Sequence, residues 1–373
     1  MVRYRRKRPR PNDLTQRYQA GRLDSDPNLD RDALDLPRGK PRKVGTTAED
    51  PQHDRHARSR EGLLAGTVLS ISPGSCRVHS GDKEYQCVLR GILTAEDSRR
   101  QTVLAVGDKV FFSTVSGDQG AIEQVDTRRT VLARQGTGPR SNLQHIIAAN
   151  VDQAIIVASV CEPTFRPRLI DRYLVAAEYG ELQAAICINK IDLDPQQSYL
   201  PSLEMYRSLG YAAIATSASE SIGLDELRGL LKDKTSVLAG QSGVGKSSLL
   251  TRVDPALDLK TLQISKESGK GQHATKAASL LTLSFGGYVI DTPGIRQFSL
   301  WDVPAVDLAG SYPEIARFGQ DCRFQPCSHI KEIDCAVKAA LEAGEIFPTR
   351  YESYVSLYTE LLETGKNHSR PLD

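Results

Sequence analysis

The sequence has no run of 18 apolar residues and no secretory signal peptide at its N-terminus. A helix that spans a membrane needs about 20 consecutive apolar residues, so we expect no membrane partner. Cysteine is also scarce, and four of the seven cysteines are scattered along the chain, at Cys76, Cys87, Cys161 and Cys187. Such spacing is not typical of a disulfide framework, which favours a protein of the reducing cytoplasm.

Net charge is nearly absent as well, since 48 Lys and Arg stand against 46 Asp and Glu. The balance is uneven, because residues 1–60 hold 16 basic and 9 acidic residues. This stretch is polar and poor in aromatic residues, so it cannot bury enough surface to offset the entropy of ordering. We predict a disordered basic arm over residues 1–60, which is either an RNA-contacting arm or a solvated tail.

With 373 residues the chain is long for one domain, and its pattern changes after the arm. Over residues 61–135, short alternating apolar runs separated by turns predict a small five-stranded barrel of the OB type. The expected strands lie at 64–71, 75–79, 85–90, 109–115 and 120–125. Five arginines of this region could contact phosphates or form a solvated rim: Arg99, Arg100, Arg128, Arg129 and Arg134.

Residues 136–303 alternate strands with helical patterns, which predicts a mostly parallel sheet covered by helices on both faces. The expected strands lie at 151–160, 183–189, 212–217 and 237–239, with helices at 168–179 and from residue 224. Around Gly286 and Gly287, an antiparallel hairpin joins the sheet. Residues 304–373 form a smaller C-terminal domain with helical patterns at 336–343 and 351–362.

A phosphate loop connects the strand that ends at Ala239 to the next helix. The motif G-x-x-x-x-G-K-[ST] is matched in full by Gly240, Gln241, Ser242, Gly243, Val244, Gly245, Lys246 and Ser247, and Ser248 follows. Its glycines let backbone N–H groups surround a phosphate, and the positive end of the helix faces the charge. Lys246 is expected to reach the β- and γ-phosphates as a catalytic group, and Ser247 to bind Mg²⁺.

Two further motifs indicate guanine as the base. Asn189-Lys190-Ile191-Asp192 follows a buried strand, where open α/β sheets place ligand contacts. The Asp192 carboxylate can accept hydrogen bonds from the ring N–H and the amine of guanine, which adenine does not offer. The Asn189 amide can meet the acceptor edge of the ring, and the stem of Lys190 can lie over it. Ser217 and Ala218, at the next strand end, would add backbone contacts.

A third motif indicates magnesium. Asp291-Thr292-Pro293-Gly294 follows a strand, so we expect Asp291 to bind the water shell of Mg²⁺ and the Gly294 N–H to reach the γ-phosphate. The polar stretch 267–277 lies between this motif and the phosphate loop and is the predicted switch segment. Thr275 is its candidate Mg²⁺ ligand, although it could equally be a surface residue.

These are the elements of a guanine-nucleotide hydrolase in a permuted order, because the base motif precedes the phosphate loop. The sheet can still be the same, since the termini of a domain usually lie close enough to be joined and reopened elsewhere. Two other classes stay open. One is a P-loop ATPase or kinase, against which Asn189 and Asp192 speak. The other is an RNA-binding assembly protein that uses GTP as a structural or regulatory ligand.

The C-terminal region contains a candidate metal site. Cys322, Cys327, His329 and Cys335 follow the spacing Cys-x4-Cys-x-His-x5-Cys. Three thiolates and an imidazole form the closed ligand set that structural zinc prefers, so we predict one structural Zn²⁺. The alternative is three free cysteines and a surface histidine.

The permuted order, the preceding barrel and the Cys-x4-Cys-x-His-x5-Cys tail resemble one family, the ribosome small subunit-dependent GTPases (RsgA, YjeQ or YloQ). The resemblance covers roughly residues 62–365. It implies a bacterial, cytoplasmic enzyme that converts GTP to GDP late in the maturation of the small ribosomal subunit and is stimulated by that subunit. It also implies that the barrel and the zinc domain contact 16S rRNA. We expect the protein to be a monomer.

The switch segment departs from the family's usual Gly-Arg-His-Thr-Thr-Thr, because here it reads Gly271-Gln272-His273-Ala274-Thr275-Lys276. Ras-like GTPases orient the attacking water with a Gln just after Asp-x-x-Gly, whereas this chain has Ile295 there. We therefore expect slow intrinsic hydrolysis. His273 is the candidate group for positioning the water, as the resemblance also implies; alternatively it contacts RNA or solvent.

Overall fold

The computed structural model describes residue 60 and residues 62–90, 102–136, 144–257, 278–291, 300–301 and 303–368, without the side chains of 365–368. All of them belong to one compact unit, Lys43–Asp373. The arm predicted over residues 1–60 lies outside the described residues except for Arg60, and the predicted switch segment 267–277 lies wholly outside them.

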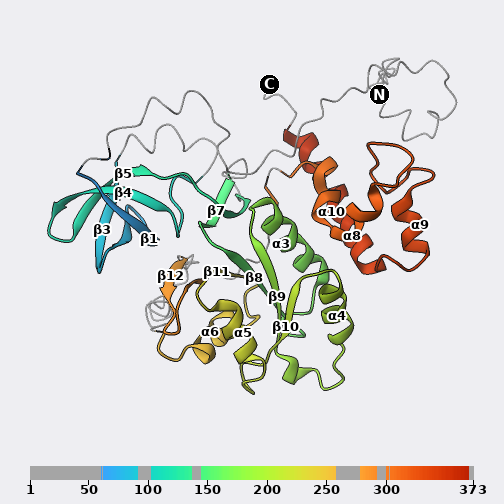
Figure 1. The fold of residues 1–373 in the computed structure, drawn as a ribbon, viewed down its shortest axis with the longest axis horizontal. Coiled ribbons are helices and arrows are strands. Elements are labelled where there is room, and N and C mark those ends of the chain that lie inside the picture. Colours follow the sequence, from blue (N-terminus) through green and yellow to red (C-terminus); the bar gives the residue numbers. More distant parts are fainter. Residues whose placement is uncertain are drawn as a thin grey trace, which may run out of the picture. The chain divides into compact units, whose positions relative to one another are not determined.

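Five strands close into a barrel, as the alternating pattern predicts (Figure 1). They are β1 (Leu64–Ser72), β2 (Ser75–Ser80), β3 (Lys83–Leu89), β4 (Lys109–Ser116) and β5 (Gln119–Val125). The strands neighbour one another in the order β1-β2-β3-β5-β4, and β4 pairs with β1 to complete the ring. Val68, Val78, Phe112 and Ile122 are fully buried inside it, because alternate residues of each strand point inward.

Arg128 holds the exit of the barrel together. Its guanidinium donates to both carboxylate oxygens of Asp108 at 2.8 Å, and to the carbonyl oxygens of Thr102 and Val103 at 3.2 Å. The Asp108 side chain is fully buried and that of Arg128 is 9% exposed. This buried ion pair excludes both the phosphate contact and the solvated rim considered for Arg128.

The second sheet region has the strand order β10-β9-β8-β11-β13-β12. Its strands are β8 (Gln153–Ser159), β9 (Gln183–Asn189), β10 (Ala212–Ala215), β11 (Thr235–Ala239), β12 (Ser279–Thr282) and β13 (Tyr288–Asp291). Five of them run parallel, and β12 is antiparallel to β13. The predicted mostly parallel sheet and its added hairpin are therefore confirmed.

Helices cover both faces of this sheet, as Figure 1 shows. They are α3 (Pro167–Tyr179), α4 (Leu200–Ser208), α5 (Leu224–Leu231) and α6 (Lys246–Val253), with a short 3-10 helix η4 (Ile191–Leu193) after β9. Successive residues of β8 point to opposite faces. Ile156 joins the core that contains Ile170 of α3, whereas Ile155 joins the core that contains Leu249 of α6.

A hairpin that the sequence pattern does not predict precedes this sheet. β6 (Val131–Gln135) pairs antiparallel with β7 (Gln144–Ala149) as a separate two-stranded sheet. The pairing crosses residue 135, where the sequence predicts a domain boundary. The sequence prediction also omits α4, a helix of nine residues with Pro201 in its first turn.

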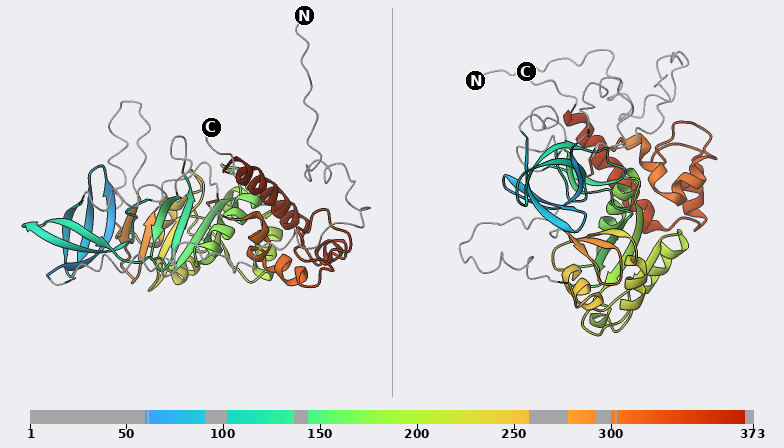
Figure 2. Two further views of the ribbon diagram at one scale, coloured as in Figure 1. Left: turned by 90° about the horizontal axis from the view of Figure 1, so that it is seen from above. Right: turned by 60° about the vertical axis from the view of Figure 1, so that its left-hand side comes forward.

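The C-terminal region is helical. It contains η5 (Ala305–Ser311), α8 (Pro313–Gly319), α9 (Ala336–Glu342) and α10 (Pro348–His368). Helix α10 extends beyond the predicted range 351–362 at both ends, and it lies beside α3 (Figure 2). Arg172 of α3 forms an ion pair with Glu360 of α10. Among the described helices, none combines the length and apolar composition that a membrane crossing requires.

Candidate functional site

The candidate site lies at one edge of the parallel sheet. Because β9, β10, β11 and β13 run in the same direction, their carboxyl ends meet at this edge. Asn189 ends β9, Ser217 follows β10, Gly240 follows β11 and Asp291 ends β13. Residues that lie up to about a hundred positions apart in the chain are thereby brought together.

The phosphate loop requires its glycines for backbone reasons. Gly240, Gly243 and Gly245 have φ angles of 147°, 87° and 98°, which side-chain-bearing residues rarely adopt. A Cβ atom on Gly240 would lie 2.2 Å from the carbonyl oxygen of Val157. The loop therefore passes close to β8 and curls back into α6, which begins at Lys246.

Lys246 and Ser247 occupy the start of α6. The Lys246 Nζ donates to the carbonyl oxygens of Gly240 and Gln241, at 2.9 and 3.0 Å. Lys246 is only 6% exposed, and burial lowers the pKa of its ammonium group to about 8, although nearby Asp291 counteracts the shift. Ser247 Oγ donates to Asp291 Oδ2 at 3.0 Å, so two predicted Mg²⁺ ligands are already adjacent.

Asn189 links the base motif to the phosphate loop. Its buried amide donates to the carbonyl oxygen of Val244 at 2.8 Å and accepts from Thr216 Oγ1 at 3.1 Å. A Cβ atom on Gly245 would lie 2.3 Å from Asn189 Nδ2. Thr216 is thus a member of the site that the motifs do not identify, because its position depends on the pairing of β9 with β10.

Asp192 is prepared to accept hydrogen bonds. The hydroxyl of Ser217, which is fully buried, donates to Asp192 Oδ1 at 2.6 Å. This hydrogen bond is the main reason why the pKa of Asp192 lies below its usual range, with a smaller contribution from Ser219. The carboxylate is therefore ionised at neutral pH and can accept from two N–H donors of a base.

A cavity of about 560 Å³ joins these groups. Its lining consists of Asn189, Lys190, Asp192, Leu193, Ala218, Ser219, Gly245, Ser248, Thr251 and Arg252. The base motif, the Ser-Ala motif and the beginning of α6 therefore line one space, of the size that ligand sites usually have. Leu193, Thr251 and Arg252 are lining residues that no motif identifies.

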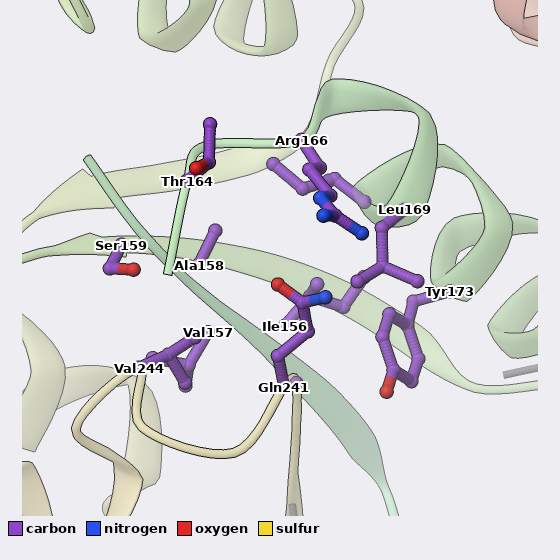
Figure 3. A pocket seen from close by; sticks show the side chains of 12 residues that line it. Ile156, Val157, Ala158, Ser159, Thr164, Arg166, Leu169, Tyr173, Gln241 and Val244 are labelled. Atoms are coloured by element: carbon purple, nitrogen blue, oxygen red, sulfur yellow. The ribbon is translucent and has the colours of Figure 1, made fainter. Parts of the chain in front are cut away.

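A second, much smaller hollow adjoins the phosphate loop at Gln241 and Val244 (Figure 3). It is lined by Gln241 and Val244 of the loop, by Arg166 and by Tyr173 of α3, and its volume is about 20 Å³. That volume suits about one water molecule and is too small for a nucleotide. The larger cavity is therefore the candidate for base binding.

The loop between β8 and α3 contacts both the base motif and the phosphate loop. Lys190 has a left-handed backbone, with φ 64°, and its Nζ donates to the carbonyl oxygen of Glu162. Ser159 Oγ donates to the carbonyl oxygen of Pro163 at 2.8 Å. The ring of Pro163 would lie 3.7 Å from a Cβ atom on Gly243. The sequence pattern does not predict these contacts.

The four predicted zinc ligands meet in the C-terminal region. Cys322 Sγ lies 3.8 Å from Cys335 Sγ, and His329 Nδ1 lies 3.4 and 3.5 Å from these two sulfurs. All four ligand atoms, including that of Cys327, lie within 4.8 Å of one another. Zinc–sulfur bonds of about 2.3 Å imply tetrahedral edges of about 3.8 Å between sulfurs and about 3.5 Å between sulfur and nitrogen. The cluster therefore fits a tetrahedral metal.

Glu332 organises the loop that carries these ligands. Its carboxylate accepts from the Ser328 hydroxyl and from the backbone N–H groups of Ser328, Ile330 and Lys331, at 2.6 to 3.1 Å. Burial alone would raise the pKa of Glu332, but these hydrogen bonds outweigh it and lower the pKa to about 2. The Tyr351 hydroxyl of α10 also donates to the His329 carbonyl oxygen at 2.7 Å.

Several predicted site residues lie outside the described residues. They are His273, Thr275 and Gly294. The other predicted nucleotide-site residues lie in the phosphate loop or close to it and to the large cavity. The four metal-ligand candidates form a separate cluster.

Known proteins resemble this chain over most of its length. The RsgA GTPase family model matches residues 125–301. A small ribosomal subunit biogenesis GTPase RsgA of Chlorobaculum tepidum is 39% identical over 309 residues, which cover 80% of this chain and 99% of that protein. The protein of the same name from Moorella thermoacetica is 38% identical, with 82% and 100% covered.

Solved structures resemble it too. The crystal structure of YjeQ from Thermotoga maritima has a TM-score of 0.63 and 35% identity, and covers 80% of this chain and 99% of that one. YloQ, described as a circularly permuted GTPase, has a TM-score of 0.61 and 31% identity, with 85% and 99% covered. The permuted order deduced from the motifs is therefore also found in a protein of similar structure.

Proposed function

The chain belongs to the RsgA family of GTPases, and on this premise we propose that it hydrolyses GTP in the maturation of the small ribosomal subunit. One observation carries the proposal: the guanine motif and the phosphate loop line a single cavity, with Asp192 and Gly245 in its walls. A phosphate loop alone would suit many nucleotides, whereas the ionised Asp192 selects a base that offers two donors. The family prediction made from the motifs is confirmed.

The phosphate end of the site has a role for each predicted residue. The backbone N–H groups of Gly240 to Ser248 surround the phosphates, and Lys246 binds the β- and γ-phosphates. Ser247, Asp291 and Thr275 hold Mg²⁺, which neutralises charge that develops on the phosphates. The adjacency of Ser247 and Asp291 supports this assignment.

Two assignments concern residues beyond the described part. The Gly294 N–H would contact the γ-phosphate, and His273 would position the attacking water, because Ile295 cannot hydrogen-bond to it. Intrinsic hydrolysis is then slow and rises when the small subunit binds. A His273→Ala variant with undiminished subunit-stimulated turnover would remove this role from His273.

The base end of the site is assigned to Asp192, Lys190 and Asn189, with backbone contacts from Ser217 and Ala218. Asp192 accepts from guanine, and Lys190 covers one face of the ring. Of the two N–H groups on the Asn189 amide, one is occupied by Val244, so the other serves the acceptor edge of the base.

The remaining parts of the chain are assigned to RNA binding and to structure. We assign residues 61–135 to an OB-type barrel, 136–303 to the GTPase domain and 304–373 to a helical zinc-binding domain, with the arm at 1–60. The hairpin of β6 and β7 joins the first two of these domains across residue 135. Cys322, Cys327, His329 and Cys335 hold one structural Zn²⁺, and the match of their separations to tetrahedral edges supports it. The barrel and the zinc domain contact 16S rRNA, and the protein acts as a cytoplasmic monomer.

Turnover of GTP by the purified protein tests the function, measured alone, with small ribosomal subunits and with large ones. We expect a stimulation that only small subunits produce. Tight GTP binding without any stimulated turnover would instead support an RNA-binding protein that uses GTP as a ligand. Competition by ATP as effective as that by GTP would favour a P-loop ATPase or kinase.

A further inference from the structure

Helix α6 contributes one face to the large cavity. Ser248, Thr251 and Arg252 line it together with Gly245, as residues spaced three and four apart on a helix do. The base motif at Asn189 to Leu193 and the Ser-Ala motif line the same cavity. A flat base that reaches Asp192 would therefore lie among side chains of α6 and Lys190.

Arg252 stands out among these lining residues. It is exposed, and among the described residues its guanidinium has no hydrogen-bond or ion-pair partner. By contrast, Arg228 of neighbouring α5 already lies over the ring of Phe285, with 4.4 Å to the centroid. Arg252 is thus a cation that the described fold leaves available beside a cavity.

The position of Arg252 along α6 separates it from the phosphate end. It lies six residues after Lys246, which is about 9 Å along a helix axis. The phosphate loop and Lys246 already provide the donors for the phosphates, so contact with the base is the role left for Arg252 in the cavity lining. None of the described lining residues is aromatic, so the guanidinium is the only flat cationic group that could stack on a base there.

We propose that Arg252 stacks on the face of the guanine ring opposite Lys190 and so acts as a further binding residue of the nucleotide site. This inference rests on the proposed function, because it requires guanine in the cavity. A guanidinium is planar and weakly hydrated, and it stacks favourably on π-systems. Every base offers such a π-face, so the contact adds affinity, while Asp192 provides selectivity.

The test is the dissociation constant of a fluorescent GDP analogue for the full chain and three variants of Arg252. Arg252→Ala removes the group, Arg252→Lys keeps the charge without the plane, and Arg252→Tyr keeps a plane without the charge. Lys232→Ala is the matched control, because Lys232 is an exposed cation on the same domain away from the cavity. Circular dichroism checks that each variant is folded.

We expect Arg252→Ala to weaken binding about two- to fivefold, the size of an exposed cation–π contact. Arg252→Tyr should stay within about twofold of the parent, Arg252→Lys should remain weakened, and Lys232→Ala should have no effect. Parent-like binding by Arg252→Ala, or full recovery in Arg252→Lys, would overturn the stacking contact. If the parent protein binds ADP as well as GDP, the proposed function itself fails, and the inference fails with it.

Discussion

Replacing Arg350 by alanine is the substitution for which we expect the largest loss of stability. This residue of α10 is 1% exposed and donates to Asp171 of α3 and to Glu314 of α8. Its guanidinium also lies 4.4 Å from the ring centroid of Tyr312. One side chain therefore joins the C-terminal helices to the α/β sheet region. Burial alone would lower the pKa of Arg350, but the adjacent carboxylates outweigh it and raise the pKa above its usual range.

The cost of Arg350→Ala follows from the two carboxylates that it leaves behind. Breaking a buried ion pair by removing one partner costs about 3–5 kcal/mol, because the remaining charge stays buried. A stranded carboxylate can escape by taking up a proton. From an ordinary pKa near 4, that step costs about 4 kcal/mol at pH 7 and about 1.4 kcal/mol less for each pH unit below it. We therefore expect a loss of about 3–5 kcal/mol at pH 7 that shrinks towards pH 5.

The sign agrees with linkage, since a carboxyl whose pKa is raised by folding destabilises the protein as the pH rises through that range. Burial already raises the pKa of Asp171 in the parent protein, and Arg350 opposes the shift. Removing Arg350 must therefore raise that pKa further and make the variant's stability more sensitive to pH.

Urea unfolding followed by circular dichroism, at pH 7 and pH 5, measures this effect. Arg168→Ala is the control, because its pair with Glu352 joins the same two helices but is more than 60% exposed on both sides. That variant should lose less than about 1 kcal/mol. A loss below about 1 kcal/mol for Arg350→Ala, or a loss that does not change with pH, would refute the reasoning.

Three further predictions follow from the site and the metal cluster. The pKa of Lys246 is about 8 in the nucleotide-free protein, and bound phosphates favour its protonated form, so GDP affinity should fall up to about tenfold per pH unit above pH 8. Binding titrations from pH 7 to 9 measure this, and an affinity that does not change with pH would contradict it. Because hydrogen bonds hold the pKa of Glu332 near 2, its contribution is present above an unfolded pKa of about 4.3 and is lost as the pH falls towards 2. Glu332→Gln should therefore cost about 1–2 kcal/mol at pH 7 in thermal unfolding, after allowance for solvent screening, and an equal cost at pH 2 would speak against it. Atomic absorption should find one zinc per chain; Cys335→Ser should lose it and Cys161→Ser, outside the cluster, should keep it.

Short-range patterns made much of the fold and site predictable. The glycines and Lys246 of the phosphate loop, the four residues from Asn189 to Asp192, and the cysteine spacing each encode chemistry within a few positions. The barrel strands were predictable because alternation of inward and outward residues is also local. The hairpin at Gly286 and Gly287 was predictable because two adjacent glycines between short apolar runs are also a local signal.

The parts that were not predictable depend on partners distant in the chain. Arg128 reads as a surface cation until Asp108 is seen beside it, and Asp171 reads as an exposed helix residue until Arg350 covers it. The apolar periodicity of α3 places its core face correctly, yet nothing local indicates that a carboxylate is buried on that helix. Arg252 and Thr216 enter the site only because the sheet brings their elements together.

The permuted chain order and the site are compatible for a geometric reason. The nucleotide contacts depend on which strands are neighbours and on their common direction, and neither property depends on where the chain enters the sheet. β11, which carries the phosphate loop, lies between β8 and β13, although β9 and β10 separate it from β8 in the chain. Asn189 therefore reaches Val244 and Ser247 reaches Asp291 across the same edge. A motif search that requires the usual order would miss this site, whereas one that asks only for a strand end before each motif would find it.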